Sequence, residues 1–209
     1  MLGFKNLEEA RGRSDLLHLL DHPASIGHLN LREMLTRVEA EKVNKPKYMP
    51  RDYSVDDFLL GQVENFLCSD ETEITLRPNT SLNNRNKSVG GQLSIDIERM
   101  LNYGEKVKSE SIVTDNRGRR FLDYESVKIA TQGSAGQSFG AFCNDGMVFE
   151  HTGTCNDGVG KGACGGKIVV KSPLGGGEYY GHNVLVGNFT LFGASGGKTF
   201  IEGQAGDRF

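Results

Sequence analysis

The stretch Gly162-Ala-Cys-Gly-Gly-Lys167 returns further along the chain as Gly193-Ala-Ser-Gly-Gly-Lys198, and a β-prone run follows each copy. A second pair repeats as GSAGQSF at 133–139 and GQAGDRF at 203–209. The spacing between the two copies differs from one pair to the other. The repeats therefore predict stacked coils of unequal length and not a strict tandem array.

Short β-prone runs of three to five residues alternate with glycine clusters from residue 130 onward, at 147–150, 167–170, 184–186, 188–192 and 199–201. One short strand cannot bury its apolar face alone, whereas coils stacked on each other pair their backbone groups and build a continuous core. Right-twisted strands favour right-handed connections. The pattern predicts a mainly β fold, a right-handed parallel β-helix preceded by an N-terminal helical arm.

The glycines are unevenly placed in the 209 residues, because 20 of the 28 lie after residue 130. A mainly helical C-terminal half is excluded, since each interior glycine costs a helix about 1 kcal/mol relative to alanine. Glycine permits positive φ at sharp corners and lets neighbouring backbones approach closely. Nine structural repeat glycines are expected at such places: Gly133, Gly136, Gly140, Gly162, Gly165, Gly193, Gly196, Gly203 and Gly206.

The sequence before residue 130 predicts helices and a linker instead of coils. Apolar residues recur at helical intervals in 55–67, and a second helix is expected near 88–102. Shorter features are expected as capped helices in 14–20 and after Asn30, a linker at 41–51, strands at 72–76 and 125–130, and a surface hairpin inserted at 112–125. We divide the chain into a helical arm, residues 1–68, and the glycine-repeat domain, residues 69–209.

Composition excludes several kinds of partner. The net charge of −3 is spread over both halves and offers no basic field for a phosphate backbone, so nucleic acid is not expected as a partner. No apolar run approaches the roughly 20 residues that cross a bilayer, and no signal peptide is visible. The cysteines, Cys68, Cys143, Cys155 and Cys164, are therefore expected as free thiols in the cytoplasm.

Two glycine motifs invite a nucleotide-binding interpretation. Residues 160–165 match GxGxxG, but that fingerprint needs a following helix, and here a β-prone run follows. Residues 193–199 resemble a phosphate-binding loop that is one residue short. The copy at 162–167 is followed by Ile168, at the position where a phosphate-binding loop has its metal-binding Ser or Thr. Both motifs are therefore interpreted as loop corners of the repeat.

Metal and catalytic signals are weak. Pro23 ends the helix directly after His18 and His22, and His151, Cys155 and Cys164 lack the paired CxxC spacing of a zinc site. Inward packing is the more common role for such cysteines. No catalytic, cofactor-binding or metal-binding residue is assigned.

Several segments resemble a known family in the same order along the chain. GSAGQSFGAF at 133–142, VGKGACGGKIVV at 159–170, VGNFTLFGASGG at 186–197 and GQAGDRF at 203–209 are similar to the glycine-repeat (GXGXG) C-terminal domain of the glutamate synthase large (alpha) subunit. GRSDLL at 12–17 resembles the segment after that enzyme's flavin domain. NNRNKSVGGQLS at 83–94 resembles the entry into its β-helix.

The resemblance implies a scaffolding domain without catalytic residues, which packs the FMN domain and the glutamine amidotransferase domain together. The parent enzyme makes glutamate from glutamine and 2-oxoglutarate in nitrogen metabolism, with FMN and an iron–sulfur cluster. No cofactor is expected in this segment. The family domain continues for further coils, so the last coil here is expected to be uncapped, as in a truncated fragment or a split enzyme.

Two other functions stay open from the sequence. The same glycine repeat resembles a β-helix subunit of formylmethanofuran dehydrogenase, although the arm motifs favour glutamate synthase. A free-standing polysaccharide enzyme would place paired carboxylates on one strand face. Here the candidates are scattered: Asp145, Glu150, Asp157 and Glu202.

Overall fold

The computed structural model describes residues 3–18, 30–37, 52–104, 107–173 and 180–209. It divides into two compact units, residues 1–50 and residues 51–209, called here the N-terminal unit and the sheet unit. No described helix is long and apolar enough to cross a membrane. The boundary predicted at 68/69 stays a prediction.

The described part of the N-terminal unit contains only short helical turns. α1 spans Leu7–Ala10, and Asn6 caps it by accepting a hydrogen bond from the Glu9 amide at 3.1 Å. The 3-10 helix η1 spans Ser14–Leu16, within the predicted 14–20 helix. The segment after Asn30 forms turns in its described part, so a helix there was wrong for residues 30–37. His22, Pro23 and the whole predicted linker at 41–51 lie outside the described residues.

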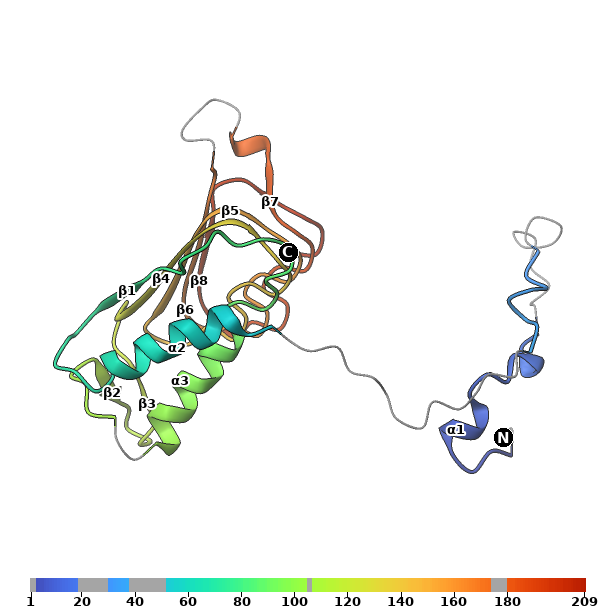
Figure 1. The fold of residues 1–209 in the computed structure, drawn as a ribbon, viewed down its shortest axis with the longest axis horizontal. Helices are drawn as coiled ribbons and strands as arrows, with labels where there is room; N and C mark the ends of the chain where they lie inside the picture. The colour runs from blue at the N-terminus through green and yellow to red at the C-terminus, as the bar shows by residue number, and fades with distance from the viewer. Residues whose placement is uncertain (1–2, 19–29, 38–51, 105–106, 174–179) are drawn as a thin grey trace. The chain divides into compact units, whose positions relative to one another are not determined.

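The sheet unit is mixed α/β and is built on one seven-stranded, mainly parallel sheet (Figure 1). Its main path runs β1-β4-β5-β6-β8, with β7 paired to β5 and β9 paired to β7, and the named strand pairs are parallel. The strands are β1 (Ile74–Leu76), β4 (Val127–Ala135), β5 (Met147–Cys155), β6 (Cys164–Lys171), β7 (Val184–Val186), β8 (Gly196–Ile201) and β9 (Gln204–Ala205). Runs of three to five residues were wrong for β5, which has 9 residues, and for β6, which has 8. The strand expected at 125–130 is found as β4, which extends to Ala135.

The turns that precede or follow these strands lie on top of one another. We call them the turn stack: residues 88–90, 137–142, 157–162, 188–193 and 207–208. Backbone hydrogen bonds join successive turns, from the Ser88 amide to Gln137, Ser138 to Asp157, Gly158 to Asn188 and Phe189 to Asp207, at 2.7 to 2.9 Å. The expected strand at 188–192 is therefore wrong, because this segment forms turns whose amides bond to neighbouring turns.

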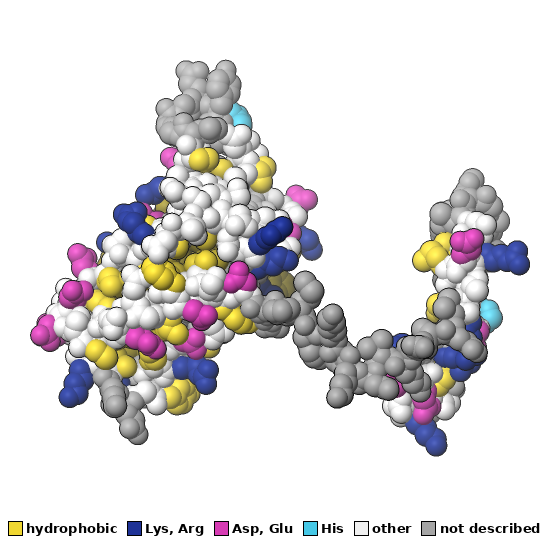
Figure 2. Space-filling model, viewed as in Figure 1, with side chains coloured by type: hydrophobic (Ala, Val, Ile, Leu, Met, Phe, Trp, Pro, Cys, Tyr) yellow, Lys and Arg dark blue, Asp and Glu magenta, His cyan; other side chains and the backbone are white. Residues whose placement is uncertain are grey.

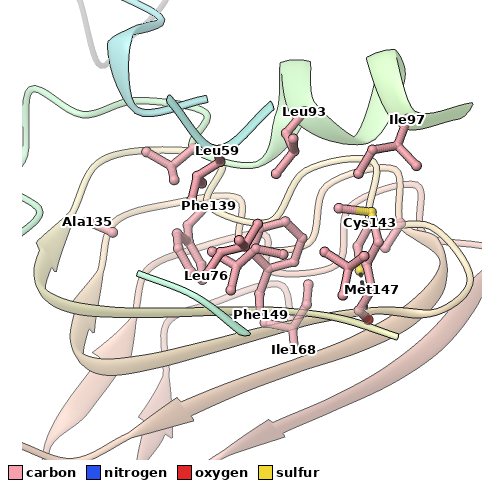
Figure 3. Packing of buried hydrophobic residues seen from close by; sticks show 14 of the residues in the cluster. Leu59, Leu76, Leu93, Ile97, Ala135, Phe139, Cys143, Met147, Phe149 and Ile168 are labelled. Carbon is pink, nitrogen blue, oxygen red and sulfur yellow. Dashed lines mark hydrogen bonds between the residues drawn. The ribbon is translucent and has the colours of Figure 1, made fainter. Parts of the chain in front are cut away.

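Two helices cover the core of the sheet unit (Figure 1). α2 spans Ser54–Phe66 and α3 spans Gly91–Tyr103, so the expected helices at 55–67 and near 88–102 are confirmed. Their buried faces meet the sheet and the turns in one apolar cluster (Figure 3). The fully enclosed members include Leu59 and Leu93 from the helices and Phe139 and Phe149 from the turn stack and the sheet.

The expected hairpin at 112–125 is also confirmed. β2 (Ile112–Thr114) and β3 (Arg120–Leu122) pair antiparallel. α3 holds this hairpin through Asn102, whose side chain donates to the Arg120 carbonyl at 3.0 Å and accepts from the Arg120 amide at 2.9 Å. The amide side chain therefore satisfies backbone groups that a further strand would otherwise pair. Glu98 adds an ion pair to Arg119 at 3.2 Å.

Candidate functional site

Several of the predicted repeat glycines lie where neighbouring backbone leaves no room for a side chain. A Cβ added at Gly133 (φ +112°) would overlap the Leu82 carbonyl oxygen, with which this coil forms a β-bridge. At Gly136 the added Cβ would lie 2.7 Å from the Asn86 carbonyl oxygen, and at Gly196 it would lie 2.5 Å from that of Cys164. At these three positions, close backbone approach excludes a side chain.

Of the other predicted glycines, two face side chains, Gly203 faces a backbone carbonyl, and three have positive φ. Cβ atoms at Gly165 and Gly206 would meet the side chains of Asp145 and Asn188. A Cβ at Gly203 would lie 2.7 Å from the Asn183 carbonyl oxygen. The remaining three have positive φ: Gly140 at 65°, Gly162 at 66° and Gly193 at 69°. Among the described residues, nothing lies within 4 Å of a Cβ built on Gly193.

The turn stack also contains a feature that sequence reasoning missed. Positive φ recurs at alternate residues in three successive turns, at Ser138, Gly140 and Phe142, then Gly158, Gly160 and Gly162, then Phe189, Leu191 and Gly193. The bulky residues lie over the glycines of the middle turn. Cβ atoms at Gly158 and Gly162 would lie 2.9 Å from the rings of Phe189 and Phe142. Each glycine of the middle turn therefore provides the space that a bulky neighbour fills.

A substitution at Gly160 would test this arrangement. Its φ is +64°, and an added Cβ would lie 2.7 Å from a methyl carbon of Leu191 and 3.0 Å from one of Ile168. We expect Gly160→Ala to lower the free energy of unfolding by about 2–3 kcal/mol through strain and overpacking. Adding Leu191→Ala should recover at least about 1 kcal/mol of that loss. Urea unfolding of the two single variants and the double variant measures the coupling, and additive losses would contradict the packing.

Asp56 is the second feature that the sequence did not reveal. It lies on α2 with an exposed fraction of 3%, and it accepts hydrogen bonds from the backbone amides of Gly90 at 2.7 Å, Gln92 at 3.0 Å and Leu93 at 3.1 Å. Burial raises the pKa of this carboxyl, and the three amides act in the opposite direction. A side chain of α2 thus satisfies the first turn of α3 and fixes one helix against the other.

His151 is fully buried within β5. Its Nε2 lies 3.1 Å from the carbonyl oxygens of Gly133 and Thr154, and its Nδ1 lies 2.9 Å from the Thr131 hydroxyl oxygen. Carbonyl oxygens only accept, so Nε2 carries the proton and the neutral ring accepts from Thr131 at Nδ1. Burial lowers the pKa of His151. The ring therefore serves packing and hydrogen bonding inside the sheet.

This histidine predicts an acid-sensitive fold. Folding lowers the pKa of His151. The contribution of this residue to the free energy of unfolding is therefore fully present above the unfolded pKa of about 6.5, and it is lost as the pH falls below that value. We expect the free energy of unfolding to fall by up to about 1.4 kcal/mol per pH unit over this range. His151→Gln should flatten the slope between about pH 7.5 and 5.5, whereas His182→Gln, an exposed histidine, should leave it unchanged. Equal slopes in all three proteins would contradict the prediction.

The cysteines do not form a ligand set for an iron–sulfur cluster. Burial raises the pKa of Cys143 and of Cys155 to about 12, and it also raises that of Cys164, whose thiol donates to the Asn144 side-chain oxygen at 3.0 Å. Raised values oppose the thiolate form that binds metals. Within the described ranges, no three His, Cys, Asp or Glu side chains are grouped to hold a metal ion.

The two nucleotide-like motifs lead into strands. Residues 160–165 end in β6 and residues 193–199 continue into β8, as the β-prone runs predicted. A helix N-terminus, which receives the phosphates in both nucleotide motifs, does not follow them. Instead, Lys167 and Lys198, the lysines that end the two GGK segments, line one hollow, which we call the strand-start cavity. It has a volume of about 430 Å³ and lies where β5, β6 and β8 begin, beside residues 121–125.

Comparison with known proteins agrees with the glycine pattern. Residues 56–209 match the family described as the GXGXG motif. The whole chain is 34% identical to the NADPH glutamate synthase large chain of Bacillus subtilis, and 33% identical to both the NADH glutamate synthase of Saccharomyces cerevisiae and ferredoxin-dependent glutamate synthase 2 of Arabidopsis thaliana. It covers 13%, 9% and 12% of these proteins respectively, so it spans about a tenth of their length.

Proposed function

Because the chain belongs to the GXGXG-motif family and is homologous over its full length to part of the glutamate synthase large chain, we propose that it is a structural domain of such an enzyme. It makes no chemical contribution of its own and holds catalytic domains in register. The observation that carries this proposal is the use of its buried polar groups. Asp56 and His151 bond to backbone groups of the same chain, as scaffold residues do.

The proposed architecture is a right-handed parallel β-helix. The parallel strand pairs and the hydrogen-bonded turn stack support it, because each coil contributes one strand and one turn to its neighbours. The nine predicted glycines, together with Gly153, Gly158 and Gly160, are proposed as the structural repeat glycines of these coils. Two aromatic rings of these coils are exposed, those of Phe192 in the turn stack and Phe200 on β8.

The proposed partners are the FMN domain and the glutamine amidotransferase domain, in the same polypeptide or as separate subunits. Figure 2 shows acidic side chains with apolar ones between them over the helical face of the sheet unit. Phe58 on α2 and Ile95 on α3 have exposed fractions of 41% and 39%. FMN and the iron–sulfur cluster are proposed for those partner domains in the cytoplasm. The named relatives favour this function over a formylmethanofuran dehydrogenase subunit.

The test is a deletion with complementation. The parent polypeptide without this segment should lose glutamate formation from glutamine and 2-oxoglutarate, and adding the 209-residue chain should restore part of it. Gel filtration should show the chain bound to the flavin-domain polypeptide. The Lys171→Met chain, altered at an exposed strand position outside α2 and α3, serves as the control. A fully active deletion variant, together with no association, would overturn the proposal.

A further inference from the structure

We propose that the strand-start cavity binds a small zwitterion of the α-amino acid class, with its carboxylate on Lys198 and its ammonium group on Asp123. The cavity volume of about 430 Å³ falls within the usual range for small-molecule sites. The proposal does not rest on the scaffolding role. It follows from which charges at the cavity are already paired and which are not.

Three charged residues at the cavity, Glu125, Lys167 and Asp145, are already paired. Glu125 forms ion pairs with Lys167 and, at 3.8 Å, with Lys128. Asp145 forms an ion pair with Arg119 at 3.1 Å, and the same guanidinium also bonds Glu98. These pairs hold the cavity walls together and leave little charge for a ligand.

One cation and one anion remain at the same cavity. In the described part of the chain, the Lys198 ammonium group has no ion pair or hydrogen bond. Asp123 accepts a bond from the adjacent Tyr124 amide at 2.7 Å, and it forms no ion pair within the described residues. Lys198 and Asp123 line the same cavity and do not pair with each other. The cavity therefore offers a ligand one unpaired group of each sign.

The repeat places Lys198 beside the cavity floor. Lys198 is in register with Lys167 on the neighbouring parallel strand, and such strands lie about 4.8 Å apart. The glycines before each lysine carry no side chains that would fill the hollow. Phe121 provides a half-buried aromatic ring at the cavity, whereas the side chains of Met147 and Val148 are buried. We therefore expect an amino acid with an uncharged, apolar side chain to bind better than a charged one.

The choice of ligand class follows from the two unpaired charges. A simple anion would satisfy Lys198 and leave Asp123 without a partner, whereas a simple amine would do the reverse. A zwitterion satisfies both groups at once. The ligand class is thus distinguished from a phosphate or a monocarboxylate by its ammonium group.

The test is a titration of the full 209-residue chain with L-leucine, followed by amide NMR shifts. We expect saturable shifts confined to the cavity backbone, at Gly165, Gly166, Gly197 and Lys198. Lys198→Met and Asp123→Asn, both at exposed positions, should each weaken binding at least about tenfold. Lys171→Met is the matched control, because Lys171 is an exposed strand lysine paired with Glu150 outside the cavity.

Two analogues separate the charges of the ligand. Leucinol lacks the carboxylate and 4-methyl-2-oxopentanoate lacks the ammonium group, and each should bind at least about tenfold more weakly than leucine. Equal binding of the oxo acid would overturn the proposal in favour of a plain anion site. The absence of cavity shifts at millimolar leucine, or an equal loss in Lys171→Met, would also overturn it.

Discussion

Replacing Gly153 by alanine is expected to prevent the sheet unit from folding. Gly153 pairs with Gly133 across the parallel strands β4 and β5. It has φ of +141°, and an added Cβ would overlap the Gly133 carbonyl oxygen and carbon. Both neighbours are backbone in the middle of the sheet, so neither can move without breaking the ladder. We expect a loss above about 4 kcal/mol, a large part of the stability of an ordinary domain.

Two matched substitutions separate the effect of steric overlap from the effect of backbone strain. Gly118 in the hairpin loop has φ of +81° with open space around it, so Gly118→Ala should cost only about 1 kcal/mol of strain. Gly61 lies in α2, again with open space, and Gly61→Ala should raise stability by about 1 kcal/mol. Far-ultraviolet circular dichroism with urea unfolding measures all three. A Gly153→Ala protein that unfolds like Gly118→Ala would show that the strands do not approach as described.

Removing the Asp56 carboxylate is the second change with a large expected effect. Asp56→Ala leaves the buried amides of Gly90 and Leu93, and the half-buried amide of Gln92, without their acceptor. We expect a loss of about 2–4 kcal/mol in the free energy of unfolding, because unpaired buried donors are costly and a helix loses its cap. Asp56→Asn keeps one acceptor oxygen and should lie between the alanine variant and the unaltered protein.

The neighbouring aspartate provides the control for this change. Asp57 is exposed on the same helix, so Asp57→Ala should stay within about 0.5 kcal/mol of the unaltered protein. Amide hydrogen exchange in α3 gives a local readout, since exchange should accelerate at its first turn in Asp56→Ala. Equal unfolding free energies for the Asp56→Ala and Asp57→Ala variants would contradict the capping role.

The parts of the fold that follow from local patterns could be predicted from the sequence. The apolar period of 55–67 gives α2, and the insertion at 112–125 gives a hairpin, because both patterns are complete within a few residues. The recurring GGK segments predict stacked parallel strands, and Lys167 and Lys198 are in register as that repeat requires. Such features need no knowledge of distant contacts.

The missed features depend on contacts between distant residues or on tertiary context. In the sequence, Asp56 is one more polar residue of a helix. Only the packing of α2 on α3 brings its carboxylate to the first turn of α3, which it caps. Positive φ at Phe142 and Leu191 opposes their own preferences, and it occurs where glycines of the adjacent turn leave room for the two side chains. Strand lengths were underestimated because β4 and β5 continue through glycine and threonine, which lack a strong apolar signal.

The parallel pairing also sets the order in which the nascent chain can fold. Val127 pairs with Met147 and Val148 pairs with Lys167, so each coil finds its partner soon after it is synthesised. β1 and α2 are made earlier, yet the strand that pairs β1 and the ring of Phe149 that shares their apolar cluster come much later. The apolar faces of the early helices therefore stay uncovered while more than half of the unit is translated. Chaperone binding to a stalled nascent chain should consequently peak before β5 leaves the ribosome and decline once β6 is free.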